Sequence, residues 1–139
     1  MDRRRTHRRL RIMVADDDRD TVDTLACILR DEGHVVYTAY GGYEALAAVQ
    51  MFRPDAVILD VDLPQLSGFD VVEQLRAHPK TQPLPIIVHT GMTLTDEERN
   101  RLADQLLTIV PKFNRESLFQ HLASFYRNSR EQRTMKMVA

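Results

Sequence analysis

Short apolar runs alternate with helix-like segments along most of the chain. Four apolar runs and a weaker fifth are typical of buried strands; they occupy residues 10–15, 34–39, 56–59, 86–88 and 107–110. Periodic or capped segments predict helices over residues 20–32, 43–52, 69–77 and 95–106, and a last one after Asn114. Continuously apolar strands are typical of a parallel sheet covered on both faces. The pattern therefore predicts an α/β fold with a doubly wound, five-stranded parallel sheet.

Local signals predict where helices begin and which side chains face inward. Gly33 ends the first predicted helix, Thr95 begins an acid-rich one, and Asn114 caps the last. We expect these side chains to face the core: Leu46, Val49 and Phe52 in the second helix, and Leu118, Leu122 and Phe125 in the last. Cys27 lies beside the apolar face of the first helix, and we expect it in the core.

Composition and charge narrow the class of protein. The chain has 139 residues, enough for one domain, and Cys27 is its single cysteine, which fits a reducing cytoplasm. Residues 1–11 carry a net charge of +5 and residues 127–139 of +3, which leaves −9 for residues 12–126 of a chain with net charge −1. An acidic body argues against nucleic-acid binding but suits a bound cation. No apolar stretch reaches the roughly 18 residues of a membrane span.

We accordingly expect a domain over residues 9–127, a basic arm over residues 1–8 and a basic tail over residues 128–139. The candidate functional residues lie where predicted strands end. Three aspartates, Asp16 to Asp18, follow the first strand, and Asp60 follows the third. Thr90 ends the fourth strand and Lys112 follows the fifth.

In a doubly wound sheet the carboxyl ends of the strands share one edge, so these residues are predicted to converge. Neighbouring carboxylates repel unless a hard cation lies between them, which favours Mg²⁺, with Mn²⁺ as an option. One carboxylate could then attack phosphorus, while Lys112 and Thr90 stabilise the phosphoryl oxygens.

Four segments resemble the receiver domains of response regulators: IMVADDD (12–18), AVILDVDLPQLSGFD (56–70), IIVHTG (86–91) and VPKF (110–113). The resemblance implies a flavodoxin-like sheet of order 2-1-3-4-5 and a switch in a two-component system. It implies that Asp60 is the phosphoacceptor, Thr90 the switch hydroxyl and Lys112 the phosphate-binding lysine. Asp16 and Asp17 are then the acidic pair that binds Mg²⁺ beside Asp60, Asp17 as a direct ligand. The backbone carbonyl of Asp62 is the implied third protein ligand.

The same resemblance implies a histidine kinase or a histidine phosphotransfer protein as the phosphodonor, and a protein as the downstream target. No output domain fits in 139 residues, so we expect signalling by protein contact, either from a stand-alone chain or within a larger hybrid protein. A homodimer is one option. We expect no enzymatic activity beyond the domain's own phosphorylation and dephosphorylation.

Several alternatives remain open at the level of sequence. The family's usual Lys-Pro order is Pro111-Lys112 here, so Lys112 either reaches the phosphate or points outward. The aspartate run could merely cap a helix, a role we assign to Asp18, and His89 is favoured as a packed histidine over a metal ligand. Two other functions compete: a haloacid-dehalogenase-type phosphatase that uses Asp60 and Asp62 as a D-x-D motif, and a degenerate receiver that binds partners without phosphorylation.

Overall fold

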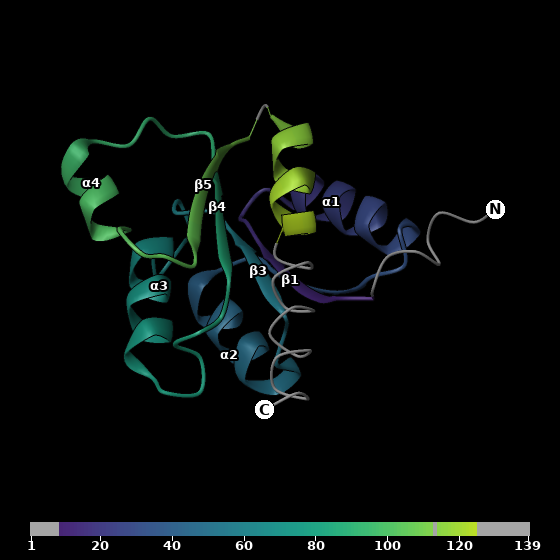
Figure 1. The fold of residues 1–139 in the computed structure, drawn as a ribbon, viewed down its shortest axis with the longest axis horizontal. Helices are drawn as coiled ribbons and strands as arrows, with labels where there is room; N and C mark the ends of the chain where they lie inside the picture. The colour runs from purple at the N-terminus through teal and green to yellow at the C-terminus, as the bar shows by residue number, and fades with distance from the viewer. Residues whose placement is uncertain (1–8, 113, 125–139) are drawn as a thin grey trace, which may run out of the picture.

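A five-stranded parallel sheet forms the centre of the molecule (Figure 1). The computed structural model describes residues 9–112 and 114–124. The strands lie in the order β2-β1-β3-β4-β5, as predicted. Their bounds are Arg11–Ala15 (β1), Val35–Ala39 (β2), Ala56–Leu59 (β3), Ile86–Thr90 (β4) and Leu107–Pro111 (β5). The helices are Arg19–Asp31 (α1), Gly42–Phe52 (α2), Gly68–Ala77 (α3) and Asp96–Arg101 (α4), and residues 115–124 are also helical.

Alternating strand residues supply two separate cores, one on each face of the sheet. Met13 and Val57 belong to the core beneath α2 and α3, whereas Ile12 and Ile58 belong to the core beneath α1 and the helix of residues 115–124. Figure 1 shows α2 and α3 on one side of the sheet and α1 on the other. This two-sided cover explains why the strands are apolar at nearly every position.

The helix signals that were read from the sequence are confirmed at three places. Asp18 is the N-cap of α1 and accepts hydrogen bonds from the Asp20 amide and the Thr21 hydroxyl. Gly33 follows the helix with φ of 102°, a conformation that glycine adopts without strain. Thr95 and Glu98 form a capping box at the start of α4.

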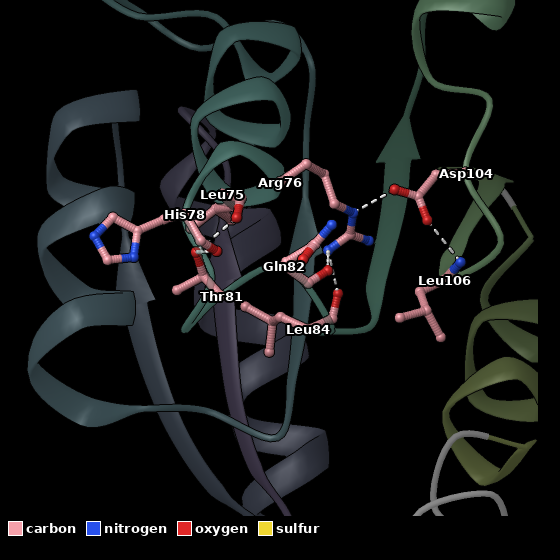
Figure 2. Close-up of polar contacts among 8 residues, drawn as sticks. All are labelled: Leu75, Arg76, His78, Thr81, Gln82, Leu84, Asp104 and Leu106. Atoms are coloured by element: carbon pink, nitrogen blue, oxygen red, sulfur yellow. Dashed lines mark hydrogen bonds and ion pairs between the residues drawn. The ribbon is translucent and has the colours of Figure 1, made fainter.

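The predicted length of α4 is wrong, because the helix ends at Arg101 rather than near Leu106. Leu102 turns into the core, and the Asp104 carboxylate accepts a hydrogen bond from the Leu106 amide at 2.8 Å. Asp104 also pairs with Arg76 of α3 (Figure 2). These contacts hold residues 102–106 in a turn, and local periodicity does not reveal a partner 28 residues away.

Two predictions about side-chain burial need correction, and some lie outside the described residues. The buried face of α2 consists of Ala45, Ala48 and Val49, with the larger Leu46 and Phe52 only partly covered at its margin. Cys27 is exposed rather than in the core. Leu118 and Leu122 are buried as expected. The basic arm 1–8, residue 113 and the segment 125–139, with Phe125 and the basic tail, lie outside the described residues.

Arg76 joins three segments at the end of the sheet opposite the aspartates. Its guanidinium pairs with Asp104 and donates hydrogen bonds to the carbonyl groups of Gln82 and Leu84, at 3.0 and 2.6 Å (Figure 2). The proline-rich loop before β4 and the turn before β5 are thereby tied to α3. Within the described residues, no helix is long and apolar enough to cross a membrane.

Candidate functional site

Strand register brings the predicted site residues to one edge of the sheet. Ala15 pairs with Leu59 across β1 and β3, so Asp16 and Asp60 leave adjacent strands side by side. The Asp60 amide donates to the Ala15 carbonyl at 2.9 Å, which continues the ladder into the site. On the other side, Thr90 pairs with Pro111 across β4 and β5, immediately before Lys112.

Three carboxylates gather at this edge in the arrangement that the sequence predicted. One oxygen each from Asp16, Asp17 and Asp60 lies within 4.8 Å of the others. Asp16 and Asp60 are buried, at 2% and 3% exposure, whereas Asp17 is exposed to solvent. Carboxylate oxygens with one side open to water are the donors that Mg²⁺ and Mn²⁺ prefer. The residues present therefore fit a hard divalent cation.

Lys112 points into the site. Its Nζ lies 2.8 Å from Oδ2 of Asp16 and 2.8 Å from Oδ2 of Asp60, so one ammonium group bridges the two buried carboxylates. The Lys112 amide donates to the Thr90 carbonyl at 3.1 Å, which anchors the backbone beside β4. Of the two alignments left open by the Pro111-Lys112 order, the structure has the inward one.

The burial of opposite charges shifts the pKa values of both partners. Burial raises the pKa of Asp16 to about 6, against the opposing effect of the hydrogen bonds from Lys112 and from the Asp18 amide. Burial alone would lower the pKa of Lys112, but its hydrogen bonds to Asp16 and Asp60 outweigh this, and the pKa rises. Lys112 therefore remains protonated. The buried Asp16 carboxylate binds a proton more readily than an exposed carboxylate does.

Thr90 and Asp62 lie at this edge in different environments. Thr90 is buried, and its hydroxyl accepts a hydrogen bond from the Met92 amide at 3.2 Å, so the hydroxyl holds the loop that follows β4. Asp62 is exposed, and its amide donates to Oδ1 of Asp60 at 3.2 Å. Among the described residues, the carboxylate of Asp62 does not join the acidic group.

Gly42 and Gly68 let the loop between β3 and α3 approach its neighbours closely. A Cβ atom at Gly68 would lie 2.3 Å from the Asp60 carbonyl oxygen, and one at Gly42 would lie 2.0 Å from the Leu66 carbonyl oxygen. The loop that follows Asp60 is therefore packed directly against the starts of α2 and α3. The close approach of Gly42 to Leu66 is visible only in three dimensions, because the two residues are far apart in the sequence.

The fold and this edge of carboxylates and lysine match a known family. The family model for the response regulator receiver domain matches residues 12–123, and the chain belongs to this family. The chain is therefore a receiver domain of the two-component type. Membership sets aside the haloacid-dehalogenase alternative, since Asp60 follows the third strand of a receiver sheet.

Individual relatives agree with this membership. Response regulator MprA of Mycobacterium avium (strain 104) is 34% identical over 131 residues, which cover 94% of this chain and 57% of MprA. Chemotaxis protein CheY4 of Vibrio cholerae superposes with a TM-score of 0.75 at 29% identity, covering 85% of this chain and 99% of CheY4. Response regulator TrrA of Thermotoga maritima, in complex with Mg²⁺ and BeF, has a TM-score of 0.71 at 29% identity, covering 83% of this chain and 97% of TrrA.

Some relatives are much longer than this chain. The match covers 57% of the length of MprA and 13% of that of Protein RcaC from Microchaete diplosiphon. In those proteins the receiver is one part of a larger molecule. The activities of the whole relatives therefore do not transfer directly to residues 12–123.

Proposed function

We propose that this receiver domain takes a phosphoryl group onto Asp60 in a Mg²⁺-dependent reaction and signals through an altered surface. The observation that carries the proposal is the bridge from Lys112 Nζ to Asp16 and Asp60, within a group of three carboxylates. A carboxylate beside a fixed cation and a metal-binding pair has what phosphoryl transfer requires, namely a nucleophile and compensation of charge.

The residues divide the chemistry among themselves. A carboxylate oxygen of Asp60 attacks phosphorus, the bond from phosphorus to the donor's nitrogen or oxygen breaks, and the leaving group keeps the electron pair and takes up a proton. Lys112 exchanges its contact with the Asp60 carboxylate for the phosphoryl oxygens, and the Thr90 hydroxyl donates to one of them. Mg²⁺, when bound, neutralises the negative charge around phosphorus. Asp16, Asp17, Asp60 and the backbone carbonyl of Asp62 would hold it.

The partners follow from this chemistry. The donor is a histidine kinase or a histidine phosphotransfer protein in the cytoplasm, since the imidazole of a phosphorylated histidine is a good leaving group. The output is contact with a downstream protein through residues 9–127, flanked by the basic arm 1–8 and the basic tail 128–139. The relative MtrA is described as a DNA-binding response regulator, but the acidic body of this chain argues against nucleic acid as its own partner.

Incubation with acetyl phosphate and Mg²⁺, followed by intact-mass measurement, tests the proposal. The parent should gain one phosphate, and Asp60→Asn should gain none because the nucleophile is absent. Asp55→Asn, on the opposite end of β3, is the matched control and should gain one phosphate like the parent. An Asp60→Asn protein that still gains phosphate would move the nucleophile elsewhere. A parent that gains none under any donor would favour the degenerate receiver, which binds partners without phosphorylation.

A further inference from the structure

Asp17 is the member of the acidic group whose place depends most on the backbone. Asp16 and Asp60 are buried, and the Nζ atom of Lys112 lies 2.8 Å from each of them. Asp17 is exposed, and among the described residues Lys112 makes no ion pair with it. The Asp17 carboxylate therefore reaches a shared cation only if the short segment between β1 and α1 holds it there.

Hydrogen bonds fix this segment on both sides of Asp17. Before it, the Asp16 amide donates to the Ala39 carbonyl at 3.1 Å, which continues the pairing of β1 with β2. After it, the Asp18 amide donates to Oδ1 of Asp16 at 3.0 Å, and Asp18 is the N-cap of α1. Asp17 thus lies between the end of a strand and the start of a helix, and a shift of the first turn of α1 displaces it.

Tyr40 joins the start of α1 to the end of β2. The guanidinium carbon of Arg19 lies 4.2 Å from the centroid of the Tyr40 ring, which is a cation–π contact. The Tyr40 hydroxyl donates a hydrogen bond to Oδ1 of Asp23 at 3.3 Å. Arg19 and Asp23 are four residues apart and so lie on one face of the helix. One tyrosine therefore contacts two successive turns of α1.

The tyrosine is itself held in place from the other side. Its amide donates to Oε2 of Glu44, in the first turn of α2, at 3.1 Å. Its ring is half-buried and packs against the core beneath α1. A ring fixed by the core and by α2 is a firm support for Arg19, whose long side chain is exposed.

We propose that Tyr40 is a positioning residue, which holds the first turn of α1 so that Asp17 reaches the cation site. This inference rests on the proposed binding of Mg²⁺ by the acidic group, but the hold on α1 can be measured without metal. Without the ring, the segment between β1 and α1 gains freedom that metal binding must then remove, and the affinity for Mg²⁺ falls.

Three variants separate the ring from its hydroxyl and from general effects. Tyr40→Leu keeps an apolar side chain against the core and removes both contacts to α1. Tyr40→Phe is the conservative variant, because it keeps the ring beside Arg19 and loses only the bond to Asp23. Tyr43→Leu changes an exposed tyrosine of α2 and is the matched control. None of the three alters the net charge, so the electrostatic attraction of a cation to the site stays the same.

Hydrogen exchange in the metal-free protein tests the hold on α1. The Asp18 amide donates to Asp16, and the Asp20 amide donates to Oδ1 of Asp18, so both amides report the order of this segment. NMR should show their exchange about threefold faster in Tyr40→Leu, the size expected of one exposed cation–π contact, and close to parental in Tyr40→Phe. Leu29, in the last turn of α1, is the internal reference. Unchanged rates at Asp18 and Asp20 overturn the proposal, and so does an equal rise at Leu29.

Calorimetric titration with Mg²⁺ tests the consequence at the site. Tyr40→Leu should bind Mg²⁺ about threefold more weakly than the parent, whereas Tyr40→Phe and Tyr43→Leu should bind it as the parent does. An unchanged affinity in Tyr40→Leu overturns the proposal. A parent that binds no Mg²⁺ would refute the proposed function instead, and the exchange rates would still decide whether Tyr40 holds the helix. Should Tyr40→Leu not fold, Arg19→Lys takes its place, because it keeps the charge and loses the planar group that stacks on the ring.

Discussion

At the scale of single residues, Asp16 is the carboxylate of the site whose ionisation is made unfavourable by burial. Its carboxylate is buried between two other carboxylates and Lys112, and its pKa is raised to about 6, chiefly by burial. An acid with a raised pKa binds a proton more readily in the folded than in the unfolded chain. Its contribution to stability is therefore most favourable at low pH and is lost as the pH rises through about 6.

The pH dependence of Asp16 is measurable against Asp16→Asn without Mg²⁺. Between pH 7 and pH 5 the parent should gain about 1 kcal/mol in free energy of unfolding relative to the variant. His89, whose pKa is lowered by burial, opposes this gain in the same range, but it is present in both proteins and cancels in the difference. Urea denaturation at the two pH values gives the result. An unchanged difference would show that Asp16 is already ionised at little cost in the folded protein.

At the scale of elements, α4 is attached to the molecule by polar contacts. None of its six residues is buried. Arg101 pairs with Glu73 of α3 at 2.6 Å and lies over the Phe69 ring, 4.9 Å from its centroid, while Arg76 of α3 pairs with Asp104 just beyond the helix. The first contact is exposed and the second is largely covered. Water screens the exposed pair of Arg101 and Glu73, whereas the covered pair of Arg76 and Asp104 is screened less.

The two arginines should therefore differ in their effect on stability. Arg76→Ala removes the guanidinium that serves Asp104 and two carbonyl groups, and should cost about 2–3 kcal/mol in free energy of unfolding. Arg101→Ala is the matched control on the exposed side and should change the urea midpoint only slightly. Equal losses of stability for both variants would show that the covered contacts of Arg76 are no stronger than the exposed ion pair of Arg101.

At the scale of the whole molecule, the two cores and the acidic edge make opposite contributions to the stability of the fold. Apolar layers on both faces hold the sheet together, and the same sheet forces Asp16, Asp17 and Asp60 into one small volume. A cation at this edge removes the repulsion that folding creates, because Asp60 is far from Asp16 and Asp17 in an unfolded chain. Binding should thus stabilise the entire fold by linkage.

Thermal melts with and without Mg²⁺ measure this linkage. At ten times its dissociation constant, Mg²⁺ should add about 1.4 kcal/mol to the free energy of unfolding. Asp17→Asn should melt above the metal-free parent because repulsion is relieved, and should lose most of the response to Mg²⁺. Potassium chloride at equal ionic strength is the control for screening. A melting temperature of the parent that does not respond to millimolar Mg²⁺ would contradict a shared cation site.

The sequence by itself determined the strands, the fold class and the residues at the strand ends. These follow from apolar runs and caps, which act over a few residues, and from the rule that parallel strands share a carboxyl edge. Asp16, Asp17 and Asp60 could be grouped on that basis alone. The short length of α4 could not be predicted, because it depends on the contact of Asp104 with Arg76, which lies 28 residues away in the sequence.

Only the tertiary structure decided how Lys112 is placed. The Pro111-Lys112 order allowed an inward or an outward lysine, and the register of β5 against β4 selected the inward one. The same register pairs His89 with Val110, and His89 and Lys112 line one pocket, an arrangement for which no local pattern exists. Side-chain convergence depends on how strands pair in space, whereas the strands themselves depend on neighbours in the chain.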